Sequence, residues 1–318
     1  MNYIVLDLEW NQSAKGKEYS ISSMPFEIIQ VGAVKLNDKF QVIGEFDRLV
    51  RPQVYKKLHS ICSEVTEITE EMLLSGDHFV DVAEDFLSWC GNDYIFCTWG
   101  DCDLLELQRN MNHYGMDNTF PMPFFFYDVQ KLYSIYFSKG KHRLSLQAAV
   151  QELNLEEKDK YHTAIFDARY TTRVMKCLEF SSVEKFYSID TYRVPRNRKE
   201  EITVNFGDYS KYISKTFDTR EKALNDREVC SCRCFLCGKP MARMIKWFAG
   251  SRKNYYALFL CEEHGFIKGR LRTNMTDDKK YFAIKILKCT DVAGVEKIQQ
   301  KKQREREHRR EKRLNKSK

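Results

Sequence analysis

The chain has 318 residues and a hydrophobic content of 43%, which is enough for one large domain and a smaller one. Two acids occur within the first nine residues and no apolar run reaches about 18 residues, so we expect no signal peptide, no membrane span and a cytoplasmic protein. Residues 1–180 hold 18 Lys and Arg against 27 Asp and Glu, residues 181–296 hold 23 against 15, and residues 297–318 hold 11 against 3. This division predicts a first domain whose acids bind cations and a second half that attracts a polyanion.

The first 180 residues alternate the patterns of strands and helices. Short apolar segments predict strands, and longer segments with one apolar face predict helices. The expected strands cover 2–10, 27–38, 42–52, 94–100 and the start of 124–133, and the expected helices cover 69–73, 79–90, 102–115, 145–155 and 166–178. Because three antiparallel strands precede a strand–helix alternation, we predict a mixed α/β sheet with helices on both faces.

Three different segments follow this first domain. Residues 181–227 lose the alternation and contain Pro195 and a charged run, which predicts a linker or helical extension. Residues 228–290 are rich in Cys, Gly and β-prone residues and predict a small β domain. Residues 291–318 have almost no apolar side chains, so we expect a basic tail that is either a solvated helix or disordered.

An acidic pair ends the first strand. Asp7 and Glu9 lie two residues apart, so their side chains share one face of the strand, and two neighbouring carboxylates repel each other. Further acids lie near the junctions of later predicted elements: Asp103, with Asp101 as an alternative, follows the fourth strand, and Asp167 lies in the last predicted helix of this domain. Such oxygen ligands predict a site for two Mg²⁺ or Mn²⁺ ions.

His162 lies five residues before Asp167. On one helix these side chains would point about 140° apart, so they converge only if His162 lies on the loop before the helix. A histidine placed there suits a general base that takes a proton from a metal-bound water.

The motifs together resemble a known family. "DLE" ending the first strand, "WGDCDLLEL" at a strand–helix junction and "H-x4-D" near residue 165 resemble the DEDDh group of 3′–5′ exonucleases. "HSICSEVTEIT" is most similar to its Eri-type and KapD-like branch, with ribonuclease T and oligoribonuclease as more distant relatives. The resemblance covers about 1–180 and implies a ribonuclease H-like fold. It also implies that Asp7 bridges both metals, that Glu9 and Asp167 complete one metal site, that Asp103 supports the other, and that His162 is the catalytic base.

The resemblance also indicates where substrate binds. The family loop that packs against the terminal nucleoside corresponds to Val65–Thr69, which implies contacts from Thr66 and Ile68. This chain has Glu67 where the family usually has Gly. Trp10 either covers the end base or seals the core, and the aromatic run 124–127 is either a stacking platform or a buried strand.

A cysteine cluster marks the small β domain. Cys234-x2-Cys237 and Cys261-x2-His264 are separated by 23 residues, which is typical of one structural, tetrahedral Zn²⁺ in a zinc ribbon. Cys230 or Cys232 could replace one of these ligands. The ribbon and its flanks also carry basic residues interleaved with aromatic ones, as single-stranded nucleic acid requires: Arg243, Lys246, Arg252, Lys253, Lys268, Arg270, Arg272, Trp247, Tyr255 and Tyr256.

The sequence therefore predicts a metal-dependent 3′–5′ exonuclease that hydrolyses single-stranded RNA to nucleoside monophosphates. The alternatives are the same reaction on single-stranded DNA, or a non-catalytic adaptor that binds nucleic acid or the ribosome. The basic tail would add affinity for RNA or for a ribosome-like RNA–protein complex. The ribonuclease T-like relatives also allow a homodimer.

Overall fold

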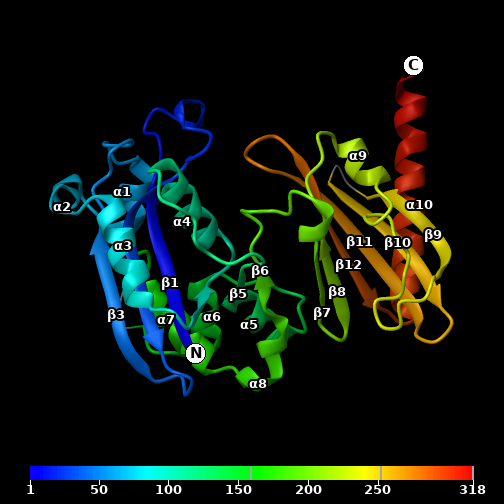
Figure 1. The fold of residues 1–318 in the computed structure, drawn as a ribbon, viewed down its shortest axis with the longest axis horizontal. Coiled ribbons are helices and arrows are strands. Elements are labelled where there is room, and N and C mark those ends of the chain that lie inside the picture. The colour runs from blue at the N-terminus through cyan, green and yellow to red at the C-terminus, as the bar shows by residue number, and fades with distance from the viewer. Residues whose placement is uncertain (158–159, 251–252, 317–318) are drawn as a thin grey trace. The chain divides into compact units, whose positions relative to one another are not determined.

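The computed structural model describes residues 1–157, 160–250 and 253–316 (Figure 1). The chain divides into two compact units, Met1–Tyr192 and Arg193–Lys318. Among the described residues, no helix is both long enough and apolar enough to cross a membrane.

The first unit is built on a six-stranded sheet whose strand order is β3-β2-β1-β4-β5-β6. β1 pairs antiparallel with β2 and parallel with β4, so the sheet is mixed, as expected. Its strands are β1 (Asn2–Asn11), β2 (Glu27–Leu36), β3 (Val42–Leu49), β4 (Tyr94–Thr98), β5 (Phe125–Asp128) and β6 (Ser188–Ile189). The aromatic run lies in and beside β5, where Phe126 and Tyr127 are buried, which supports the interpretation as a buried strand.

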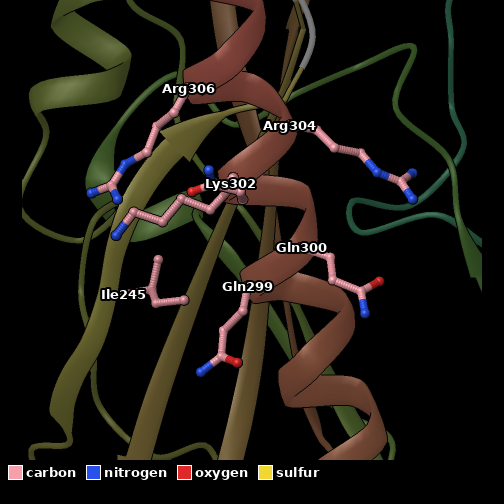
Figure 2. A pocket seen from close by; sticks show the side chains of 7 residues that line it. Ile245, Gln299, Gln300, Lys302, Arg304 and Arg306 are labelled. Atoms are coloured by element: carbon pink, nitrogen blue, oxygen red, sulfur yellow. The ribbon is translucent and has the colours of Figure 1, made fainter.

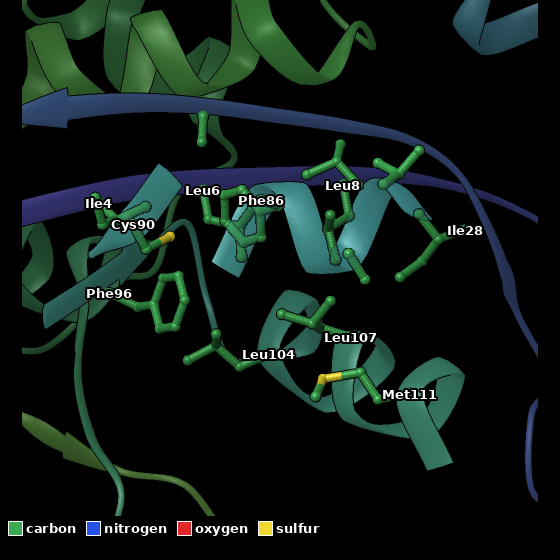
Figure 3. Close-up of a cluster of buried hydrophobic side chains, with 14 of the residues drawn as sticks. Ile4, Leu6, Leu8, Ile28, Phe86, Cys90, Phe96, Leu104, Leu107 and Met111 are labelled. Atoms are coloured by element: carbon green, nitrogen blue, oxygen red, sulfur yellow. The ribbon is translucent and has the colours of Figure 1, made fainter. Parts of the chain in front are cut away.

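Helices cover both faces of this sheet. They are α1 (Ser60–Thr66), α2 (Glu70–Leu74), α3 (Phe79–Cys90), α4 (Cys102–His113), α5 (Val129–Ser138), α6 (Leu146–Glu152), α7 (Ala164–Lys176) and α8 (Phe180–Val183), with 3-10 turns at Lys17–Tyr19 and Glu184–Phe186. One face packs against α3 and α4 around Leu6, Phe86 and Leu107 (Figure 3). The other face packs against α5, α7 and α8. The unit extends beyond residue 180 because Phe180 and Val183 belong to this second core and β6 pairs with β5.

Alternation along β1 decides which face carries the acidic pair. Ile4, Leu6 and Leu8 point toward α3 and α4, whereas Val5 points toward α7. Since side chains alternate along a strand, Asp7 falls on the α7 face with Val5. The first strand thus places its carboxylates under the helix that carries Asp167.

The second unit is built on another six-stranded sheet, in the order β7-β8-β12-β11-β10-β9. Its strands are β7 (Ile202–Asn205), β8 (Tyr209–Ile213), β9 (Ala242–Ala249), β10 (Asn254–Cys261), β11 (Gly265–Met275) and β12 (Tyr281–Cys289). It also contains a 3-10 turn (Arg198–Glu200), α9 (Arg220–Asn225) and α10 (Val292–Lys316). Interpreting 181–227 as a linker or helical extension was wrong, because β7 and β8 belong to this sheet and α9 packs on it through Ala223.

The basic tail also differs from the expectation of a helix wholly in solvent. It forms α10, and Val295 and Ile298 at its start pack against Ile245 of β9 and Leu258 of β10. Farther along, Arg309 donates a hydrogen bond to the Ala249 carbonyl. The few apolar residues of the tail are thus spaced to dock one end of the helix on the sheet, while its last turns extend past the strands (Figure 1).

Candidate functional site

The acidic pair lies where α7 approaches the sheet most closely. Asp7 pairs in register with Gly32 of β2, and a Cβ on Gly32 would lie 2.2 Å from the backbone of Ala164 and Ile165. Only glycine lets the start of α7 come this close to β2. The neighbouring Gln30, which pairs with Glu9, accepts a hydrogen bond from the Ala164 amide (3.2 Å). Gln30 and Gly32 thus hold α7 over the carboxylates, and the motifs did not reveal either of them.

Asp103 joins the pair from the first turn of α4. Its Oδ1 accepts a hydrogen bond from the Leu8 amide (3.2 Å), between Asp7 and Glu9 on β1. The amide is available because β4 pairs with β1 only as far as Val5. Asp103 is 6% exposed, whereas Asp101 is exposed and precedes the helix. Of the two candidates, the structure brings Asp103 to the site.

His162 and Asp167 complete the cluster. His162 lies on the loop before α7, and its backbone amide donates to Asp167 Oδ2 (3.1 Å). His162 has a φ of 64°, a left-handed conformation that a non-glycine residue seldom adopts. One ligand atom from each of Glu9, His162 and Asp167 lies within 4.8 Å of the others. The loop position that the spacing required is thus the observed one.

The carboxylates of this cluster repel one another. Burial, followed by the charges of Asp103, Asp167 and Glu9, raises the pKa of Asp7 well above its usual range. Burial together with Asp167 and Asp103 raises the pKa of Glu9 to about 8. Burial also raises the pKa of Asp103 to about 7 and that of Asp167 to about 6. Among the described residues, no lysine or arginine forms an ion pair with any of the four.

This donor set fits divalent cations. The buried Oδ1 of Asp167 has no hydrogen-bond partner, although a buried carboxylate oxygen is costly to leave unsatisfied. Four carboxylates without a protein counter-charge offer the oxygen ligands that Mg²⁺ and Mn²⁺ prefer. Bound cations would restore the charged forms that burial disfavours.

The three residues expected to bind substrate have internal contacts. Trp10 packs against the α3/α4 core, with its ring centroid 5.7 Å from that of Phe26, which supports the core-sealing interpretation. Thr66 is buried and donates to the Cys62 carbonyl (2.8 Å), and Ile68 is 3% exposed beside Ile29. Exposed apolar side chains near this loop are instead Ile61 and Val65, which lie one turn apart on α1.

Glu67 ends α1 in the conformation that glycine would adopt. Its φ is 56°, so the backbone keeps a left-handed turn despite the side chain. The carboxylate forms an ion pair with Lys160, with Nζ–Oε distances of 2.8 and 2.9 Å. The departure from the family pattern therefore links the loop after α1 to the loop that carries His162.

In the second unit, the four predicted zinc ligands converge. Cys234 and Cys237 lie on a knuckle closed by the Gly238 amide, and Cys261 and His264 lie at the β10–β11 turn. Cys237 Sγ lies 3.7 Å from Cys261 Sγ, and His264 Nδ1 lies 3.6 Å from Cys261 Sγ and 3.7 Å from Cys234 Sγ. Zn–S bonds of about 2.3 Å and Zn–N bonds of about 2.0 Å at tetrahedral angles place ligand atoms roughly 3.5–3.8 Å apart. The cluster therefore has the dimensions of a tetrahedral zinc site.

The two alternative ligands are engaged elsewhere. Cys230 Sγ donates to the Leu224 carbonyl (2.8 Å), and Cys232 Sγ accepts from Arg243 Nε (3.3 Å). Within the cluster, the hydrogen bond from His264 lowers the pKa of Cys261 to about 6, which favours its thiolate. For Cys237 a backbone hydrogen bond with Lys239 acts in the same direction, but burial and hydrogen bonds with its neighbours raise its pKa to about 11.

Comparisons with known proteins agree with this geometry. The sequence model of the exonuclease family (RNase T) matches residues 4–175. The PolC-type DNA polymerase III of Thermotoga petrophila is 29% identical over 177 residues, which are 55% of this chain and 12% of that protein. The 3′–5′ exoribonuclease 1 of Rattus norvegicus is 22% identical over 159 residues, which are 46% of this chain and 45% of that protein. The chain thus spans less than half the length of these relatives.

Solved structures share the fold of the first unit. The nuclease domain of 3′hExo, a DEDDh family member bound to rAMP, has a TM-score of 0.51 at 18% identity and covers 59% of this chain and 96% of its own. A 3′-exonuclease, whose structure describes 3′-end-specific recognition of a histone mRNA stem-loop, has a TM-score of 0.51 at 17% identity. The match covers 59% of this chain and 85% of that exonuclease. The fold is therefore ribonuclease H-like. Because the exonuclease model spans more than half of the sequence, the chain belongs to the exonuclease (RNase T) family, as its motifs predicted.

Proposed function

We propose that the protein is a metal-dependent 3′–5′ exonuclease that acts on single-stranded RNA and releases nucleoside monophosphates. The observation that carries this proposal is the convergence of Asp7, Glu9, Asp103 and Asp167 beside His162, without a protein counter-charge among the described residues. Repelling carboxylates of this kind are stabilised by the cations that the reaction needs.

The four acids and His162 would have different roles in the reaction. Asp7, Glu9, Asp103 and Asp167 would hold two Mg²⁺ or Mn²⁺ ions, which when bound supply charge stabilisation and an acidified water. A ring nitrogen of His162 lies within 4.8 Å of carboxylate oxygens of Glu9 and Asp167 and accepts the proton of the attacking water. His162 is exposed, so it can release that proton to solvent after each turnover.

The preference for RNA over DNA comes from the relatives and not from the acidic cluster itself. The rat relative is named an exoribonuclease, and one neighbouring fold was solved with rAMP. The PolC-type relatives, by contrast, are DNA polymerases. Single-stranded DNA is therefore the second candidate substrate. An adaptor that has lost turnover is disfavoured, because a retired site would have no physical reason to keep four repelling carboxylates.

The second unit would hold one structural Zn²⁺ and bind the nucleic acid. Four protein ligands leave no open position for a substrate, so this zinc would not be catalytic. Bound to Cys234, Cys237, Cys261 and His264, it would tie the knuckle to the β10–β11 turn.

A time course on matched RNA and DNA oligomers, labelled at either end, tests the proposal with Mg²⁺ or Mn²⁺ present. We expect immediate release of labelled mononucleotide from 3′-labelled RNA and a descending ladder from 5′-labelled RNA. Faster degradation of DNA than of RNA would instead identify single-stranded DNA as the substrate. Binding without release under both metals would favour the adaptor.

A further inference from the structure

The six described strands of the second sheet carry no negative side chain. Strands β8 to β12 contain eight lysines and arginines and no aspartate or glutamate. Opposite charges on neighbouring strands would stabilise the pairing, and these five strands offer none. The register shows on which face these cations gather.

Four cations share one face of this sheet, and we call them the cationic face: Lys268, Arg270, Arg272 and Lys288. The charge of Lys297 on α10 also acts on Lys268. Lys268, Arg270 and Arg272 alternate along β11, so they point the same way. Lys268 pairs directly with Lys288 of β12. Arg270 pairs with Tyr256 of β10, over whose ring Lys301 of α10 lies 3.7 Å away.

The strand cations of the cationic face have like-charged neighbours and no ion-pair partner among the described residues. Like charges directly opposite each other, such as Lys268 and Lys288, destabilise a sheet. Burial, with the charge of Lys288 and with that of Lys297 as a weaker contribution, lowers the pKa of Lys268 although Asp291 acts in the other direction. Within the part of the chain that the structure describes, Lys268, Arg270, Arg272 and Lys288 form no ion pair. The fold therefore carries a cost here that an anionic partner would remove.

The opposite face of the sheet is occupied by the core. Trp247 and Tyr255 pack there, Arg243 donates to Cys232, and the buried Lys285 donates to the Glu228 carbonyl. The expected interleaving of cations with aromatic side chains is thus not what the structure shows: Trp247 and Tyr255 lie on the core side and Tyr256 lies under Lys301. Arg252 lies outside the described residues. The cationic face is accordingly suited to phosphates rather than to base stacking.

Helix α10 extends the same charge beyond the sheet. Its start packs on Ile245 and Leu258, which lie opposite each other on β9 and β10. Figure 2 shows Gln299, Lys302 and Arg306 pointing to the side of α10 on which Ile245 lies, where they line a groove. Amide and cationic donors thus line the groove between α10 and β9.

We propose that the cationic face binds the sugar–phosphate backbone of a single-stranded nucleic acid, at a distance along the strand from the 3′ end. This inference rests on the proposed function for the identity of the strand. Side chains two apart on β11 are about 6.8 Å apart, a spacing of the same order as that of successive phosphates in an extended single strand. Lys268, Arg270 and Arg272 can therefore engage consecutive phosphates, without reading the sequence.

The test compares two double variants of the full chain in an Asp7→Asn background, which prevents turnover during binding. Arg270→Gln/Arg272→Gln removes two charges from the cationic face, and Lys279→Gln/Lys280→Gln removes two exposed charges from the β11–β12 turn. Binding of a long single-stranded oligonucleotide is measured over a range of salt concentrations. We expect the first variant to flatten the logarithmic salt slope by about 1.4, at roughly 0.7 per phosphate contact on a single strand. The second should leave the slope unchanged.

The proposal would be overturned if both double variants had the same salt slope, or if the Arg270→Gln/Arg272→Gln variant kept the slope of its Asp7→Asn parent. Circular dichroism must first show that both variants are folded. A larger loss of binding to a matched duplex than to the single strand would also overturn it, because the face would then bind double-stranded nucleic acid.

A hydrolysis assay distinguishes a failure of this inference from a failure of the proposed function. With Asp7 intact, the Arg270→Gln/Arg272→Gln variant should raise KM for long oligomers and leave dinucleotide cleavage unchanged. A wild type that cleaves neither substrate would refute the exonuclease and leave the binding result standing.

Discussion

The acidic cluster of the first unit and the Cys/His cluster of the second both gather metal-ligand atoms from segments distant in the chain. In the acidic cluster, burial and like charge raise the pKa values, so the ionised form is costly without a cation. In the Cys/His cluster the pKa shifts go both ways, since His264 lowers the pKa of Cys261 while that of Cys237 is raised, and the ligand atoms already lie at tetrahedral spacing. The acidic ligands lie on a strand, two helices and a loop around a large core, whereas the Cys/His ligands lie on a knuckle and a turn. We therefore expect a metal ion to contribute more to the local fold at the Cys/His cluster than at the acidic cluster.

Removing zinc should have the largest effect, because a structural zinc contributes folding free energy directly. Chelation should abolish amide protection over the knuckle and the β10–β11 turn, as measured by hydrogen exchange, and leave the first unit protected. Cys230→Ser is the matched control, since that thiol lies outside the cluster, and it should bind one zinc like the wild type. Loss of protection in both units would show that the clusters are not independent.

Asp7→Asn should have the next largest effect, on activity rather than on folding. We expect nucleotide release to fall roughly 10³-fold, because metal ions supply several kcal/mol of charge stabilisation. The metal-free variant should melt no lower than the wild type, because the substitution removes one repelling charge. Asp101→Asn, a nearby exposed acid, is the control and should keep nearly full activity. Equal losses in both variants would contradict the assignment of Asp103.

The stability of the metal-free protein should depend on pH through the acidic cluster. Glu9 has a pKa of about 8 in the folded protein against an ordinary value of 4.5, so between these values the folded chain binds protons that the unfolded chain has released. The stability of the metal-free protein therefore falls as pH rises through this window. Thermal melting with and without Mg²⁺ checks this: Mg²⁺ should raise Tm more near the upper end of the window than near its lower end. A Tm increment independent of pH would contradict it.

The ion pair between Glu67 and Lys160 should have the smallest effect. The two side chains are 65% and 75% exposed, and exposed ion pairs contribute about 0–1 kcal/mol. Glu67→Gln and Lys160→Gln should each lower kcat at most about fivefold, by loosening the loop that carries His162. The double variant should be no worse than either single one. Additive losses would show that the two residues act separately.

Local patterns were sufficient to predict which residues converge in both clusters. The period of two on β1 put Asp7 and Glu9 on one face, and the five-residue spacing required His162 to precede α7. Paired Cys-x2-Cys and Cys-x2-His motifs identified the four convergent ligands. These inferences succeeded because each depends on geometry within a few residues of the motif.

Other features depended on contacts between distant segments. Residue patterns alone had indicated the mixed sheet, the acidic donor set and the paired cysteines. Contacts between distant segments decided that Trp10 packs into the core and that 209–213 pairs with β12 instead of forming a linker. They also decided that the cations of β11 and β12 face one way, because strand register is set by long-range pairing and one residue of slip would turn every side chain to the other face.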